Sequence, residues 1–221
     1  MHLRTPAVIA TAAALALGAT ACGSDESSSS ASSGSSGSSQ SAKPVADIPS
    51  LSGKSTAVTL DAGFVDALTQ LKLTPSPVGD ATITKQGIAS FPITGGNVKY
   101  FKPGSVSPYV QGEIDHDGSG LQLEGGGKTV QLTDFVVDPG ASVLTGKVTV
   151  DGKVAAESAP LFFLDGRTLK PLETAGSTAI LEGTTVKLKA EAADLLNKTF
   201  GTDALAGGLV IGVAKITVNT A

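Results

Sequence analysis

Residues 121–133 read LQLEGGGKTVQLT, and this stretch contains the clearest structural signal in the chain. Leu121 and Leu123 alternate with polar residues before the glycines, and Val130 and Leu132 alternate in the same way after them. A period of two places apolar side chains on one face of a β-strand. The stretch therefore predicts two half-buried strands on either side of a glycine-rich turn.

Similar turn signals recur along the chain in both directions from this stretch. They are Gly95-Gly96, Asp117-Gly118, Pro139-Gly140, Asp151-Gly152 and Asp165-Gly166. The Asp151-Gly152 pair follows the alternating run 148–150 and predicts a type I′ hairpin turn. Many short strands separated by such turns favour a sandwich or a closed sheet.

Two segments depart from the period of two. Residues 62–71 and 190–200 have the spacing of short helices, and Asp61 is placed to cap the first of them. We therefore expect an all-β domain that carries two short helices.

The N-terminal residues resemble an export signal. Arg4 precedes an apolar run at residues 7–17, which is shorter than the roughly 20 residues that a membrane-spanning helix needs. Small residues then lead directly to Cys22, the single cysteine of the chain. We interpret residues 1–21 as a cleaved signal peptide and Cys22 as the site of lipid attachment.

A serine-rich stretch follows, in which 12 of the 18 residues from 24 to 41 are serine. Such a composition cannot bury enough apolar surface to fold. We expect residues 22–50 to be a lipidated tether and residues 51–221 to be one domain. The expected location is extracytoplasmic, anchored to the outer face of the cytoplasmic membrane through Cys22.

Charge and motifs exclude several classes of function. The net charge is −4, and loss of Arg4 with the signal lowers it further, which argues against binding to nucleic acid. The chain has no nucleophile elbow, no pair of histidines for zinc and no phosphate-binding glycine loop before a helix. We expect no enzymatic activity, no catalytic residues and no metal site.

His116 is the one histidine that follows the signal, and three interpretations of it remain open. It can be an exposed residue of a hairpin turn at Asp117-Gly118, whose replacement would cost little stability. It can lie in a calcium loop that uses Asp115, Asp117 and Ser119. Or it can contact a ligand, with Tyr100 and Tyr109 as the nearest tyrosines in the sequence.

A family resemblance rests on two stretches. Residues 91–96, FPITGG, and the pattern Gly112-x-Ile114-x-His116-x-Gly118 resemble the HtaA-type domain of Gram-positive envelope proteins. The resemblance spans roughly residues 55–165. It implies an immunoglobulin-like β-sandwich with two short helices at one end.

The resemblance also implies a ligand, because many proteins of that family take up haem. A tyrosine near the first short helix ligates the iron there, supported by the histidine that corresponds to His116. Residues 61–72 contain Phe64 but no tyrosine, so that ligand has no counterpart here.

These observations predict a non-enzymatic cell-envelope lipoprotein whose β-sandwich presents a ligand- or partner-binding surface. The alternative is a haem-binding surface protein with His116, Tyr100 and Tyr109 as candidate ligand-binding residues. We expect no resident cofactor other than haem. The expected partners are the membrane, through the lipid on Cys22, and either haem or an envelope protein.

The lipoprotein interpretation predicts that Cys22→Ser abolishes retention in the membrane, because the mutant has no thiol to acylate. Labelled palmitate incorporation and cell fractionation measure this directly. Label in the mutant, or a mutant that stays in the membrane fraction, would contradict the prediction.

Overall fold

The computed structural model describes residues 42–220, which belong to one compact unit. The expected signal peptide, Cys22 and the serine-rich part of the tether lie outside the described residues. The strands are β1 (Ala46–Ile48), β2 (Lys54–Leu60), β3 (Thr74–Gly79), β4 (Thr82–Ile83), β5 (Ile88–Pro92), β6 (Gly95–Tyr100), β7 (Val110–Gly125), β8 (Lys128–Asp138), β9 (Val143–Val150), β10 (Lys153–Asp165), β11 (Glu173–Ala175), β12 (Thr178–Leu188) and β13 (Val210–Asn219). The helices of the described part are α1 (Ala62–Gln70), η1 (Gly166–Thr168) and α2 (Ala190–Phe200).

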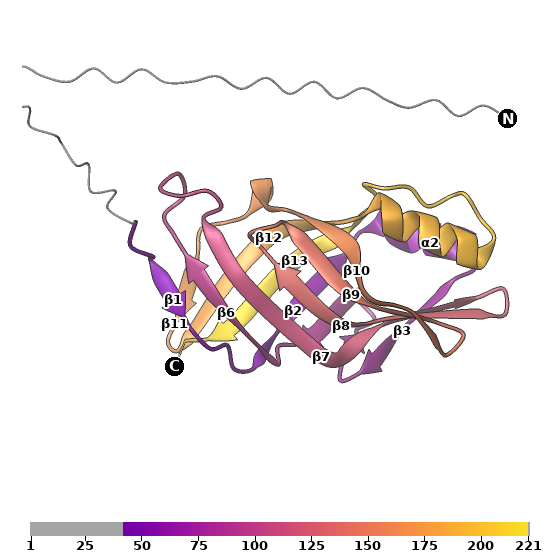
Figure 1. The fold of residues 1–221 in the computed structure, drawn as a ribbon, viewed down its shortest axis with the longest axis horizontal. Coiled ribbons are helices and arrows are strands. Elements are labelled where there is room, and N and C mark those ends of the chain that lie inside the picture. The colour runs from indigo at the N-terminus through magenta and orange to yellow at the C-terminus, as the bar shows by residue number, and fades with distance from the viewer. Residues whose placement is uncertain (1–41, 221) are drawn as a thin grey trace, which may run out of the picture. The chain divides into compact units, whose positions relative to one another are not determined.

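The strands form one antiparallel sheet, in the order β1-β6-β7-β8-β9-β10-β12-β13-β2-β5-β4. Two short strands lie off this path, β11 beside β12 and β3 beside the far half of β7. The sheet curls so that β6 to β10 lie over β2, β12 and β13 (Figure 1). The described domain is therefore all-β and sandwich-like, as the sequence predicts.

Two of the predicted turns join consecutive strands, whereas Gly95-Gly96 lies within β6 and Asp117-Gly118 within β7. Gly126 and Gly127, at φ 58° and 74°, connect β7 to β8. Asp151 and Gly152, at φ 49° and 78°, connect β9 to β10. Two successive residues at positive φ match the type I′ turn, whose twist follows that of the flanking strands.

Both predicted helices are present in the described part of the chain. The Asp61 carboxylate caps α1 by accepting a hydrogen bond of 2.8 Å from the Gly63 amide. Helix α2 ends at Gly201, which adopts φ 67°, and it packs at the end of the sheet opposite β1 (Figure 1). No helix in residues 42–220 is long and apolar enough to cross a membrane.

The sheet begins earlier than the sequence suggested. Ala46–Ile48 pairs with Val98–Tyr100, although we assigned residues 22–50 to the tether. Leu51 is 3% exposed and joins the core. Residues 46–50 therefore belong to the folded domain, and the expected boundary at residue 51 is too late.

The loop between β5 and β6 closes the curl. The Thr94 amide donates to the Asp115 carbonyl at 2.9 Å, and the Asp117 amide donates to the Thr94 hydroxyl at 2.9 Å. These bonds connect the β5 end of the sheet to β7, with six strands between them along the sheet path. The curled sheet thus has two facing layers with an interior between them.

Close backbone approach in this region requires glycine. Gly112 adopts φ 119°, and a Cβ there would collide with the main-chain oxygen of Asn97. Gly166, by contrast, has open space where its Cβ would stand and an ordinary φ. Only the first position excludes an L side chain on steric grounds.

Gly112→Ala should therefore lower the free energy of unfolding by more than about 2 kcal/mol, because strain and a backbone clash act together. The matched control Gly166→Ala should change it by less than about 0.5 kcal/mol. Urea denaturation measures both. Equal midpoints for the two variants would contradict the close approach of β6 and β7.

Candidate ligand-binding cavity

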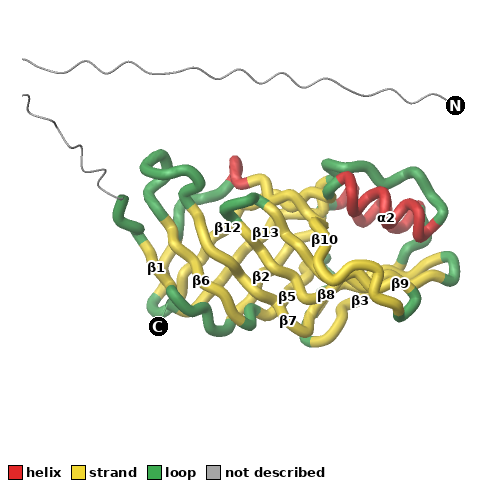
Figure 2. Tube along the Cα trace, viewed as in Figure 1, coloured by secondary structure: helices red, strands yellow, loops and turns green. Residues whose placement is uncertain are grey.

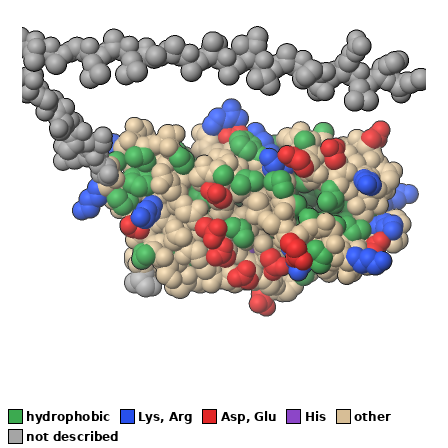
Figure 3. Space-filling view, in the orientation of Figure 1, with side chains coloured by type: hydrophobic (Ala, Val, Ile, Leu, Met, Phe, Trp, Pro, Cys, Tyr) green, Lys and Arg blue, Asp and Glu red, His purple; other side chains and the backbone are tan. Residues whose placement is uncertain are grey.

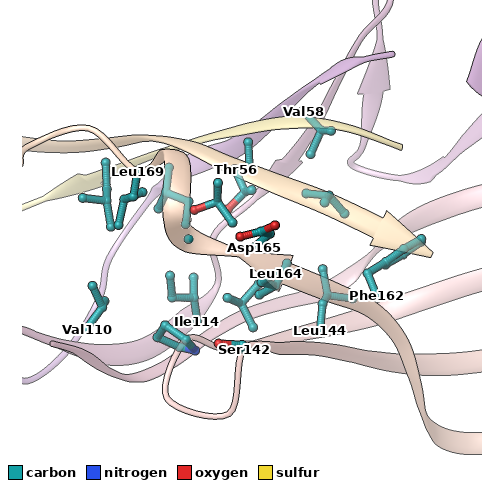
Figure 4. Close-up of a pocket in the computed structure, with 18 of the residues that line it drawn as sticks. Thr56, Val58, Val110, Ile114, Ser142, Leu144, Phe162, Leu164, Asp165 and Leu169 are labelled. Carbon is teal, nitrogen blue, oxygen red and sulfur yellow. The ribbon is translucent and has the colours of Figure 1, made fainter. Parts of the chain in front are cut away.

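A cavity of about 720 Å³ lies inside the curl of the sheet. Its walls come from both layers, including β2, β5 and β13 on one side and β7, β8 and β9 on the other. Most of the lining side chains labelled in Figure 4 are apolar, among them Ile114, Leu144 and Phe162. The sheet therefore encloses space suited to an apolar molecule.

The exposed lining residues mark the mouth of the cavity. Ser107 and Pro108 lie on the loop between β6 and β7, and Gly166 and Arg167 lie in the helical turn η1. This turn is the short red segment at the upper edge of the domain in Figure 2. The cavity therefore opens between the 101–109 loop and η1.

His116 lies in the wall of this cavity and is 1% exposed. It is part of β7, where it pairs with Phe135 of β8. The expectation of an exposed hairpin turn is therefore wrong. His116 follows Ile114 by two residues, so the alternation of the strand carries it to the same inner face.

Two hydrogen bonds fix the imidazole. Nδ1 lies 3.2 Å from the Phe135 carbonyl oxygen, and Nε2 lies 2.8 Å from the Thr56 hydroxyl. A carbonyl only accepts, so Nδ1 carries the proton and Nε2 accepts from the hydroxyl. The ring is thus a neutral imidazole whose Nε2 lone pair faces β2 across the interior.

Burial makes the charged form of His116 costly. Desolvation lowers the pKa of His116 from 6.5 to about 4, and the hydrogen bond to Phe135 and the charge of Asp117 offset this only in part. At neutral pH the ring is therefore uncharged and available as a ligand or acceptor.

The glycines after His116 form a kink within β7 and not a turn between strands. Gly118 adopts φ 69°, and its amide donates to the Asp134 carboxylate at 2.9 Å. The pairing with β8 shifts register between His116 and Gly120. The kink lets one long strand bend from the β6 side toward β3.

The calcium-loop interpretation is not supported by the arrangement around the kink. The Ser119 hydroxyl is buried and donates to the His116 carbonyl at 3.2 Å, and Asp117 contacts Thr94. Within residues 42–220, no three His, Cys, Asp or Glu side chains are grouped to hold a metal ion.

Aromatic rings line the same cavity as the histidine. Phe91 and Phe135 meet edge to face with ring centroids 5.2 Å apart, and Phe135 and Phe162 do so at 6.5 Å. All three line the cavity, as does Phe64 of α1. The helix segment without a tyrosine therefore supplies a phenyl ring to the same wall.

Tyr100 and Tyr109 also line this cavity, together with His116. Their rings pack edge to face at 5.9 Å. Burial, with a smaller contribution from Tyr100, raises the pKa of Tyr109, so its phenol keeps its proton at neutral pH. The three candidate residues thus line one cavity.

Three further residues of the site were not found from the sequence. Thr56 reaches His116 from 60 residues away, and Asp165 and Arg167 pair with each other at the cavity mouth. Arg167 and Lys187 hold the pKa of the Asp165 carboxyl well below its usual range. The Thr56 contact spans 60 residues and forms only when the sheet curls. The Asp165–Arg167 contact is local, but no motif places it at a cavity mouth.

Acid should destabilise the protein through His116. Its folded pKa lies below its unfolded value, so the unfolded state takes up the proton first as the pH falls from about 6.5 to 4. Across this window the free energy of unfolding of the wild type should fall by about 3 kcal/mol relative to that of His116→Gln, which lacks the titrating group. Urea unfolding of both proteins at several pH values measures the difference; parallel pH profiles would contradict it.

Comparisons with known proteins find matches in structure but none in sequence. No protein-family model and no curated protein match the chain in sequence. The C-terminal domain of HtaA from Corynebacterium glutamicum matches with a TM-score of 0.53 and 14% identity, over 77% of this chain and 98% of that domain. A domain-swapped dimer of a variant of that domain matches with a TM-score of 0.45 and 13% identity, over 72% of this chain and 92% of that one. The described domain therefore has the fold of the HtaA C-terminal domain, as the resemblance in its sequence implied.

Proposed function

We propose that this domain is a non-enzymatic binding protein that takes haem as its cargo in the central cavity, with His116 as the residue that contacts the iron. The buried, neutral imidazole in an apolar cavity carries the proposal. The fold shared with the HtaA domain and the haem uptake that the family resemblance implies support the same ligand.

The cavity fits a ligand of this class in size and chemistry. Small-molecule sites generally have volumes of about 300–1,000 Å³ and apolar walls with a few polar groups. This one has about 720 Å³, phenyl rings from three strands and one buried imidazole. Protein interiors are close-packed and contain few voids larger than a water molecule, so a space of this size supports a binding site.

The tautomer of His116 suits iron. A histidine that ligates metal commonly donates its other ring N–H to a carbonyl, which orients the ring and raises the basicity of the ligating nitrogen. Here Nδ1 donates to Phe135 and Nε2 presents its lone pair. The Thr56 hydroxyl occupies that lone pair, so the Thr56 side chain must turn about its Cα–Cβ bond before Nε2 can contact iron.

The tyrosines are the weaker candidates for the iron contact. A phenol ligates iron as phenolate, and burial raises the pKa of Tyr109. His116 needs no loss of a proton to act. We therefore assign Tyr100 and Tyr109 to the wall of the site and His116 to the iron.

Catalysis has little support from the site. A histidine base for nucleophilic catalysis needs a nucleophile on one ring nitrogen and an acid on the other. His116 has a threonine hydroxyl and a main-chain carbonyl instead, and Ser119 contacts its carbonyl and not its ring. Binding without reaction is the simpler use of this cavity.

A second candidate function is the binding of another apolar small molecule without iron. The absence of a tyrosine in α1, where Phe64 lines the wall, favours it. In both cases we place the domain outside the cytoplasmic membrane, held there by the expected lipid on Cys22.

Hemin titration of the full chain, followed at the Soret band, tests the iron contact. The wild type should saturate with a Kd below about 10 µM, near −7 kcal/mol, and His116→Ala should weaken binding by about tenfold or more. Tyr100→Phe and Tyr109→Phe are the matched controls and should bind as the wild type does, because their rings remain. Thermal midpoints establish that each variant is folded.

A wild type without a saturable Soret change would reject haem as the ligand. Binding kept in His116→Ala and lost in Tyr109→Phe would move the iron contact to the tyrosine.

A further inference from the structure

A charged cluster stands at the mouth of the otherwise apolar cavity. Asp165 accepts hydrogen bonds from Arg167 Nε at 2.9 Å, from Arg167 Nη2 at 2.6 Å and from Lys187 Nζ at 2.9 Å. The side chain of Asp165 is 8% exposed, whereas that of Arg167 is 83% exposed. The acid is thus covered by its two cations, and Arg167 presents its outer edge to solvent.

The cluster has a surplus of positive charge. One carboxylate faces two cations, Arg167 and Lys187. The chain as a whole carries −4, so this local excess runs against the overall charge.

Figure 3 shows basic side chains at the edge of the domain where Figure 2 draws η1. Of the charged side chains that line the cavity in the described part of the chain, Asp165 and Arg167 are the two that stay ionised at neutral pH. Lys187 is a second cation beside Asp165, so the net charge that an entering molecule meets there is positive.

We propose, resting on the function proposed above, that the cavity ligand is an amphipathic carboxylate whose anionic group binds Arg167 at the mouth while its apolar body lies inside. The proposal thus gives the orientation of the ligand in the cavity as well as its charge. A carboxylate at the mouth keeps its water contacts, and the apolar part reaches the walls around Phe135 and His116.

The chemistry of Arg167 suits this role. A guanidinium has five N–H donors in a planar fork, and the bonds to Asp165 use only Nε and Nη2. Asp165 holds the fork in place, so little side-chain freedom is lost when a second carboxylate binds. On the other side of the mouth, Ser107 lines the cavity with a hydroxyl group that can donate to the same anion.

Two sources offer this chemistry, the propionates of haem and the carboxylate of a fatty acid. A comparison of hemin with its neutral dimethyl ester separates the contribution of the carboxylates to affinity from that of the macrocycle. Parinaric acid, a fluorescent fatty acid, tests the second source.

The experiment measures binding of each probe to the full chain, to Arg167→Gln and to the control Lys170→Gln. Lys170 is also an exposed cation in an ion pair, but it does not line the cavity. Arg167→Gln should weaken hemin binding about two- to fivefold, the scale of a solvent-exposed ion pair. The wild type should bind the ester more weakly than hemin by a similar factor. Arg167→Gln should bind the ester as tightly as the wild type does. Lys170→Gln should match the wild type.

Each outcome decides between the two proposals. Hemin binding that is unchanged both in Arg167→Gln and on esterification overturns this inference and leaves haem binding intact. Binding of parinaric acid that depends on Arg167, with no hemin binding, keeps the carboxylate site and overturns haem as the ligand. A chain that binds neither probe overturns both. If Arg167→Gln does not fold, the comparison of hemin with its ester on the wild type alone decides.

Discussion

A hydrogen bond from the Thr56 hydroxyl to His116 Nε2, 2.8 Å long, crosses the interior of the curled sheet. It is the contact on which the arrangement of the site depends. A buried imidazole that lost its partner would cost about 1–3 kcal/mol, so β2 and β7 must keep a relative position that satisfies it. The second bond, from Nδ1 to Phe135, ties the ring to β8. One side chain therefore links both layers of the fold at the wall of the cavity.

This constraint explains how the fold keeps an open interior. Apolar packing at the helix end, with Leu68 of α1 and Leu196 of α2 in the core, stabilises one part of the sheet. Elsewhere, the loop from β5 to β6 joins the two layers, because Thr94 forms hydrogen bonds with β7. The space between is lined by apolar side chains but is not filled, so the walls are held by the sheet and by the bond across it.

Electrostatics divides the cavity into two regions. The interior lowers the pKa of His116 to about 4 and so keeps the ring neutral, which suits a metal or an apolar body. The mouth holds the ionised Asp165 beneath Arg167 and Lys187. A ligand with a charged end and an apolar body matches both regions at once, and a uniformly apolar or uniformly charged one matches only one of them.

The sequence by itself determined the local elements. Period-two alternation at residues 121–133, the Asp151-Gly152 turn and the Asp61 cap of the first helix are local physics, because each depends on residues a few positions apart. It also showed a resemblance whose fold the structure shares. The tertiary structure alone decided the site. His116 reads locally as a turn residue because Asp117-Gly118 follows it, yet that pair bends a long strand and leaves the histidine inside. Its partner Thr56 and the two tyrosines reach the same cavity only through the curl of the sheet, and no short-range pattern encodes contacts over such separations. The Asp165–Arg167 pair is local, but only the tertiary structure places it at the cavity mouth.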